Sequence, residues 1–235
     1  MLPRRQGSAA GTVPFGDMLV AMAEPSQPPF VRRYRDSDLD ALYEVCLRTG
    51  DGGQDASGIY ADPRLLGDTY AGAYLYLEPD LAFVLDDGGV AVGYVLGTFD
   101  TAAFVQLYRR RWVPRLGYPA PPAEPATPDE HLLATFYRPE RYLVSVLDEY
   151  PAHLHIDILP PYQGRGYGHQ LVERFVAATV AAGAPGVHVV VAASNTLAQQ
   201  FYSHVGFQQL VVPDGRPGAL YYGRKTGCYR RKTRP

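Results

Sequence analysis

The spacing of hydrophobic residues predicts alternating strands and helices from residue 30 onward. Short apolar runs bounded by glycine, proline or aspartate predict strands over 30–34, 81–85, 90–99, 152–159, 187–192, 207–212 and 219–225. Apolar residues at intervals of three and four predict helices after a cap at 36–38 and over 63–77, 101–112, 129–138, 167–182 and 196–205. Strands that alternate with helices favour an α/β (α+β) fold, with helices on the faces of a mixed sheet.

The two ends of the chain lack this periodicity. Residues 1–29 mix Gly, Ala, Ser and Pro, so we expect a flexible leader before a folded domain over 30–226. Residues 227–235 form a basic tail, which we interpret as a solvated end, with an anion-binding arm as the alternative. Within the domain, the prolines between 119 and 128 exclude regular structure and predict a surface loop.

Composition narrows the class of protein. The chain has 235 residues, 46% of them hydrophobic, which suits one sizeable core. A net charge of −2 gives no electrostatic reason to bind nucleic acid or a membrane, and no apolar stretch predicts a membrane span. The chain has two cysteines, too few for a disulfide framework, so we expect a protein of the reducing cytoplasm.

A glycine-rich turn follows the predicted strand 152–159. It reads Gln163-Gly164-Arg165-Gly166-Tyr167-Gly168 and precedes a predicted helix. Glycines allow positive φ and close approach of an anion, and the first amides of the helix have no intrahelical acceptor. The turn therefore suits a pyrophosphate, although a tight structural turn is the alternative. Its spacing matches neither the dinucleotide fingerprint nor a P-loop.

A second pattern lies in the predicted helix 196–205. Asn195 stands at the cap position, and Gly206 is placed to end the helix in a left-handed conformation. Helical spacing puts Ala198, Phe201, Tyr202 and Val205 on one face, so Tyr202 is expected to point toward the preceding strands.

Together the two patterns resemble the GNAT acetyltransferase superfamily. Gln163, Gly166 and Gly168 match its Q/R-x-x-G-x-G/A signature. The resemblance implies a GNAT fold, with a mixed, mostly antiparallel twisted sheet flanked by helices, and acetyl-CoA as cofactor. It implies that residues 163–168 bind the pyrophosphate and that Asn195, Ala198 and Phe201 line the rest of coenzyme A. It also implies that Tyr202 protonates the leaving thiolate, unless Tyr202 is simply a core aromatic residue.

A narrower resemblance covers roughly residues 30–226. These residues are similar to the carboxyl-terminal acetyltransferase-like domain of O-GlcNAcase, through the segments 31–34, 62–68, 93–98, 150–157 and 201–203 and the insertion that contains Trp112 and Pro114. That animal domain lacks the glycine turn and is regarded as a pseudo-acetyltransferase. This chain has the turn, so it resembles stand-alone bacterial relatives in which cofactor binding is retained. A catalytically weak sensor or interaction module is the alternative to an N-acetyltransferase.

The strand before the glycine turn carries candidate chemistry. In GNAT folds a bulge frees backbone amides here, which implies that the amides near Ile158 and Leu159 are oxyanion donors. His153, His155 and Asp157 share one face of the strand. We interpret Asp157 as the base or the acceptor anchor, with a buried structural acid as the alternative. A metal site on this face is a remote alternative, and we expect no metal.

The acceptor side is less well defined by the sequence. Asp100, at the end of strand 90–99, is a second acidic candidate. The 101–150 insertion is expected to border the acceptor, with Trp112 among its contacts, although a helix that merely covers the sheet fits as well. The acceptor is expected to be a primary amine of unknown structure, and the protein to be a monomer or homodimer.

Overall fold

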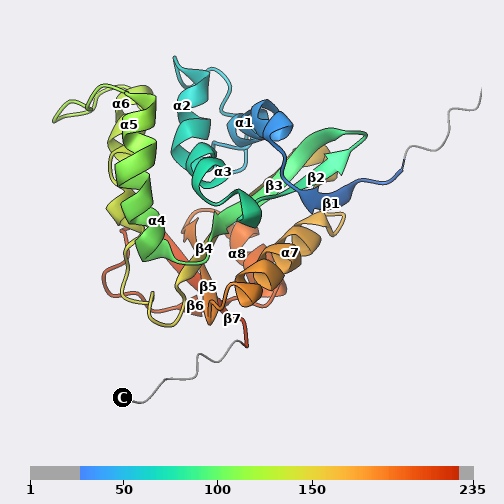
Figure 1. Ribbon diagram of the computed structural model, residues 1–235. Coiled ribbons are helices and arrows are strands. Elements are labelled where there is room, and N and C mark those ends of the chain that lie inside the picture. Colours follow the sequence, from blue (N-terminus) through green and yellow to red (C-terminus); the bar gives the residue numbers. More distant parts are fainter. Residues whose placement is uncertain (1–26, 228–235) are drawn as a thin grey trace, which may run out of the picture.

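The computed structural model describes residues 27–227, and its strands form one seven-stranded sheet (Figure 1). Residues 1–26 and 228–235, with most of the predicted leader and tail, lie outside the described part. The strand order is β1-β2-β3-β4-β5-β7-β6. Among the strands of the described residues, only β4 and β5 pair in parallel. The strands are β1 (Phe30–Arg33), β2 (Phe83–Asp87), β3 (Val90–Thr98), β4 (Ala152–Ile158), β5 (Gly186–Ala192), β6 (Gln208–Leu210) and β7 (Ala219–Lys225). The predicted mixed, mostly antiparallel sheet is confirmed.

Helices from the first two thirds of the chain cover one face of the sheet. Tyr94 and Leu96 of β3 belong to the hydrophobic cluster that these helices form with the sheet. Two continuous helical stretches each contain a turn of π-helix, η2 in the first and η4 in the second. The elements here are η1 (Asp36–Asp38), α1 (Leu39–Arg48), α2 (Pro63–Gly67), η2 (Asp68–Gly72), α3 (Ala73–Leu77), η3 (Pro79–Leu81), α4 (Thr101–Leu107), η4 (Tyr108–Trp112), α5 (Val113–Leu116), α6 (Pro128–Phe136) and η5 (Pro139–Tyr142).

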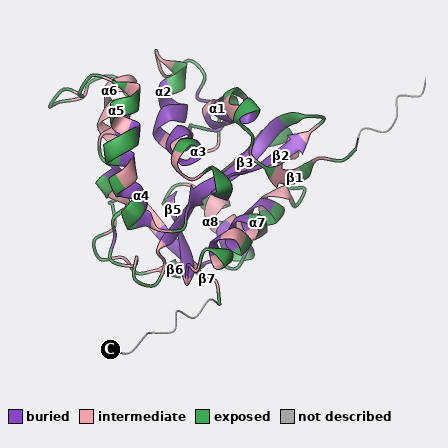
Figure 2. Ribbon diagram, in the orientation of Figure 1, coloured by how far each residue is buried: buried purple, intermediate pink, exposed green. Residues whose placement is uncertain are grey.

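The opposite face is covered by α7 (Tyr167–Ala181), which follows the short η6 (Pro160–Tyr162), and by α8 (Thr196–His204). Figure 2 shows the strands buried between the two groups of helices, with exposed residues on the outer side of α7. Gly97 of β3 permits this packing, because a Cβ there would lie 2.7 Å from the ring of Phe175 on α7.

The sheet divides at its centre. β4 pairs with β3 from Thr98↔His153 to Gly93↔Ile158. In contrast, β4 and β5 pair only at Ala152↔Val187 and His153↔His188. Beyond these residues the two parallel strands diverge. We call this the β4–β5 divergence; the carboxyl ends of both strands lie beside it.

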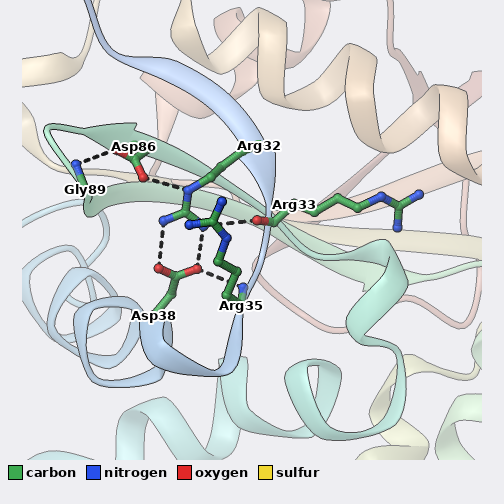
Figure 3. Close-up of polar contacts among 6 residues, drawn as sticks. All are labelled: Arg32, Arg33, Arg35, Asp38, Asp86 and Gly89. Atoms are coloured by element: carbon green, nitrogen blue, oxygen red, sulfur yellow. Dashed lines mark hydrogen bonds and ion pairs between the residues drawn. The ribbon is translucent and has the colours of Figure 1, made fainter. Parts of the chain in front are cut away.

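Arg32 joins the first strand to its neighbours (Figure 3). Its Nε donates to Asp86 on β2 at 2.6 Å, and its two terminal nitrogens donate to Asp38 on η1 at 2.6 and 2.8 Å. Asp38 also accepts from the amide of Arg35, and Asp86 from the amide of Gly89. Both carboxylates are almost fully buried, so the guanidinium balances charges that water cannot reach.

Element boundaries differ from the expected ones at a few places. The strand expected from residue 81 begins at Phe83, because Pro79 opens the turn η3 that includes Leu81. The helix expected over 101–112 continues to Leu116 through the π-turn η4. The other predicted helices and strands occur where expected, within a few residues.

Candidate functional site

The glycine loop (residues 163–168) leaves the end of β4 and opens α7. Gly164 and Gly166 have φ values of 70° and 83°, a region that favours glycine, as predicted. The side chain of Gln163 donates to the carbonyl of Ile158 at 2.7 Å and so ties the loop to β4. No side chain caps the start of α7. Its first amides are therefore available at the positive end of a fifteen-residue helix.

The loop also contacts α8. A Cβ on Gly168 would lie 2.9 Å from the ring of Phe201, so glycine permits the contact between the start of α7 and α8. Arg165 and Tyr167 flank the second positive-φ glycine in the same turn. The two sequence patterns are thus brought together in one place.

Helix α8 has the orientation that the sequence predicts. The side chain of Asn195 accepts from the amide of Ala198 at 3.0 Å, and Gly206 ends the helix with a φ of 86°. Tyr202 is 8% exposed and packs against Phe207 and Tyr222. Among residues 27–227 the Tyr202 hydroxyl has no hydrogen-bond partner. Burial, with a smaller contribution from the Asp157 carboxylate, raises the pKa of Tyr202, so the hydroxyl carries its proton at neutral pH.

Asp157 lies in a polar cluster on the other face of β4. It accepts from the hydroxyl of Tyr94 at 2.6 Å, and the Nε2 of His155 is 3.5 Å from its carboxylate. Burial raises the pKa of Asp157, while His155, Tyr94 and Thr49 oppose that shift. Its side chain nevertheless keeps 21% of its surface exposed. Asp157 can therefore be reached and can exchange a proton.

His153 does not join this cluster, although it shares a face with Asp157. Its Nε2 lies 2.7 Å from the Tyr74 hydroxyl and its Nδ1 lies 2.8 Å from the Thr101 hydroxyl, deep in the core. Burial holds the pKa of His153 well below its usual range, so the ring is neutral. Across the described residues no group of three or more His, Cys, Asp or Glu side chains is arranged to hold a metal ion.

One of the two expected backbone donors is already used. The amide of Leu159 donates to the carbonyl of Val92 on β3 at 3.0 Å. Backbone groups of successive strand residues point to opposite edges, so the amide of Ile158 points away from β3, toward the β4–β5 divergence. The expectation is corrected accordingly: Ile158 offers a donor and Leu159 does not.

Two residues expected near an acceptor lie elsewhere. The side chain of Asp100 accepts from the amide of Ala103 and caps α4, at the end of β3 opposite the glycine loop. Trp112 is 5% exposed, and its indole nitrogen donates to the carbonyl of Asp68 at 2.9 Å. Asp100 thus serves a helix cap, and Trp112 fills the core.

A hollow that the sequence did not indicate lies near the carboxyl end of α6. It has a volume of about 740 Å³ and includes Arg138, Arg141 and Arg216 in its lining. These arginines come from two segments more than seventy residues apart, so local patterns give no signal for it.

No helix among residues 27–227 is long and apolar enough to cross a bilayer.

Comparisons with known proteins agree with this geometry. Residues 139–209 match the model of the acetyltransferase (GNAT) domain family. Protein O-GlcNAcase of Rattus norvegicus is 25% identical over 191 residues, which are 80% of this chain and 21% of that protein. The chain thus spans about a fifth of the length of this relative.

Solved structures extend the match to most of the chain. The crystal structure of SsHAT is 47% identical, with a TM-score of 0.81 over 86% of this chain and 99% of that one. The PaiA N-acetyltransferase from Thermoplasma acidophilum, in complex with coenzyme A, shares the fold with a TM-score of 0.52 at 14% identity, over 84% of this chain and 99% of that one. The signature loop, the divergent strands and these matches show that the chain belongs to the GNAT acetyltransferase superfamily.

Proposed function

We propose that this protein binds acetyl-CoA and transfers its acetyl group to a primary amine. The glycine loop carries the proposal, because it presents the uncapped amides of α7 at the end of β4 and next to Phe201 of α8. The unpartnered Tyr202 hydroxyl and the free Ile158 amide fit the same group, since both can donate to a ligand that lies between the strands. The family membership and the coenzyme A complex of the PaiA enzyme support this choice.

Three groups of the chain suit acetyl transfer. Bound acetyl-CoA supplies an activated thioester. The Ile158 amide can donate to a carbonyl oxygen that gains negative charge. The Tyr202 hydroxyl holds a proton and can give it to a leaving thiolate. Asp157 can accept a proton from the attacking amine once it is ionised. Because burial raises the pKa of Asp157, we expect kcat/KM to rise with pH through that raised pKa.

Calorimetric titration with acetyl-CoA tests the binding step. Gly166→Val places a branched side chain at a φ of 83° and should lower the affinity at least about tenfold, because the loop amides move. Gly183→Val is the matched control: its φ is 84°, but it lies at the far end of α7. Equal effects of the two substitutions on affinity, or no binding by the unaltered protein at millimolar acetyl-CoA, would remove the proposal.

A Tyr202→Phe variant tests the catalytic step. The ring keeps its packing, so acetyl-CoA affinity should stay unchanged while kcat falls by about 10² or more. Turnover is followed by thiol release with a panel of amines. If no amine gives release above hydrolysis while acetyl-CoA still binds, the protein is a binding module, as the similarity to the O-GlcNAcase region also allows.

A further inference from the structure

A cavity with an excess of positive charge lies between η2, the end of α6 with η5, and the connection from β6 to β7. Its volume is about 740 Å³. We call it the arginine cavity, and the side chains that matter here are Tyr70, His131, Arg138, Glu140, Arg141 and Arg216. The lining therefore contains three guanidinium groups and one carboxylate.

The single carboxylate is already engaged. Glu140 accepts from the Nε of Arg109 at 2.7 Å, outside the cavity lining. Asp214, two residues before Arg216, accepts instead from the hydroxyl of Ser145 at 2.7 Å. In the described part of the chain no carboxylate lies within ion-pair distance of the three cavity arginines. Their charge is left for a ligand to balance.

Arg141 is held in place by neutral groups. Its Nη1 donates to the carbonyls of Thr135 and Arg138, and its Nη2 donates to the hydroxyl of Tyr142 at 2.8 Å. The guanidinium also lies 4.4 Å from the ring centroid of Tyr142 and 5.8 Å from that of Tyr70. A guanidinium has five N–H donors, so two remain without a partner within residues 27–227. The group is fixed and still able to bind an anion through two bonds.

One aromatic ring links this cavity to the proposed catalytic cluster. The guanidinium of Arg141 lies 5.8 Å from the centroid of the Tyr70 ring, and the same ring stacks on His155 with centroids 6.0 Å apart. His155 in turn lies 3.5 Å from the carboxylate of Asp157. Arg141 and Asp157 are therefore connected through two aromatic rings that contact each other.

We propose that the arginine cavity binds an anionic group of the acceptor, so that the substrate class is a primary amine that also carries a carboxylate or phosphate. This inference rests on the proposed acetyl transfer and specifies its acceptor. The contacts run from Arg141 through Tyr70 and His155 to Asp157, so the amine and the anion are several bonds apart in the acceptor. Arg141 and Arg216 hold the anion, and Asp157 receives the proton of the amine.

Matched amines test the substrate class. The pairs are 6-aminohexanoate with hexylamine and 2-aminoethyl phosphate with ethanolamine, assayed by thiol release. We expect kcat/KM for at least one anionic member to exceed that of its neutral partner at least about tenfold, as charge-assisted hydrogen bonds would produce. The better member also tells whether carboxylate or phosphate fits. Neutral amines that react as well as the anionic ones overturn the proposal.

Variants of the arginines then test whether the preference for anionic amines arises in the arginine cavity. Arg216→Ala removes an exposed cation and leaves the fold unchanged, while Arg141→Gln removes the half-buried one. Both should lower kcat/KM for the anionic amine about tenfold, mainly through KM, and leave the neutral amine within about twofold. Arg110→Ala is the matched control, because Arg110 is exposed on η4 and does not line the cavity. Equal losses for both amines would overturn the assignment.

A binding measurement separates this inference from the proposed reaction. Hexanoate is titrated into the full chain saturated with coenzyme A, so that the glycine loop is occupied. Binding that is lost in Arg216→Ala and kept in Arg110→Ala supports the anion site even if no amine is acetylated. Absence of hexanoate and inorganic phosphate binding at millimolar concentration overturns it, whatever the outcome for acetyl transfer.

Discussion

Two arginines occupy the interior of this protein in opposite ways. Arg32 is surrounded by the carboxylates of Asp38 and Asp86, and its side chain is 10% exposed. Arg141 contacts carbonyls, a hydroxyl and two aromatic rings, with no carboxylate among its described partners. An arginine whose charge is balanced by the fold serves stability. One that is positioned by neutral groups retains its charge for a ligand.

The largest expected loss of stability follows from the substitution of Arg32. Arg32→Met should lower the free energy of unfolding by about 3–5 kcal/mol, because it leaves two buried carboxylates without a cation. Urea denaturation measures the loss. Arg33→Met is the control: its pair with Asp80 is exposed, so the change should stay within about 0.5 kcal/mol. Similar losses for both variants would show that the buried network adds no more than a surface pair.

Low pH should reduce the difference in stability between the unaltered protein and Arg32→Met. Burial acts to raise the pKa of Asp38, but the hydrogen bonds from Arg32 and the Arg35 amide outweigh it, so the net pKa is lowered. A lowered folded-state pKa gives stability that is present above the unfolded pKa of about 3.9 and is lost as pH falls through the folded value. The stability gap between the unaltered protein and Arg32→Met should therefore shrink below about pH 4. A gap that is constant between neutral and acidic pH contradicts this linkage.

Arg141→Gln should cost less stability than Arg32→Met, about 1–2 kcal/mol. It removes hydrogen bonds to the carbonyls of Thr135 and Arg138 but leaves no buried carboxylate unpaired. The same urea titration applies. Added phosphate should stabilise the unaltered protein more than this variant, because a bound anion favours the folded state that holds it. A loss as large as that of Arg32→Met would mean that Arg141 is structural.

The smallest effect is expected for Arg216→Ala. Arg216 is exposed and its side chain has no described partner, so the free energy of unfolding should change by less than about 0.5 kcal/mol. Thermal unfolding without ligand is the measurement. A clear loss of stability would give Arg216 a structural role and weaken its assignment to the anion.

Local patterns predicted the parts of the site that depend on local geometry. The positive φ of Gly166, the cap at Asn195 and the two faces of β4 each follow from spacing along a single element. The amide of Leu159 was misjudged because the ladder between β3 and β4, which pairs Gly93 with Ile158, continues by one more residue to Val92. How far two strands stay paired depends on both of them, so the pattern of one strand does not report it.

Contacts between residues far apart in the sequence determine the parts of the site that local patterns did not predict. Trp112 reads as an exposed aromatic beside arginines, yet Gly72 leaves room for its ring, as a Cβ there would lie 2.6 Å from it. Arg141 lines the arginine cavity together with Tyr70 and Arg216, which belong to different parts of the chain. No periodicity within a single element reports such three-way contacts.

The narrow pairing of β4 with β5 has a mechanical consequence. In the part of the chain described, two residue pairs join the half of the sheet that contains β1 to the half that contains β6. Side-chain packing holds the rest of that boundary together, without the longer ladders that join β3 to β4 and β5 to β7. A ligand that lies in the β4–β5 divergence would therefore cross-link the two halves of the sheet.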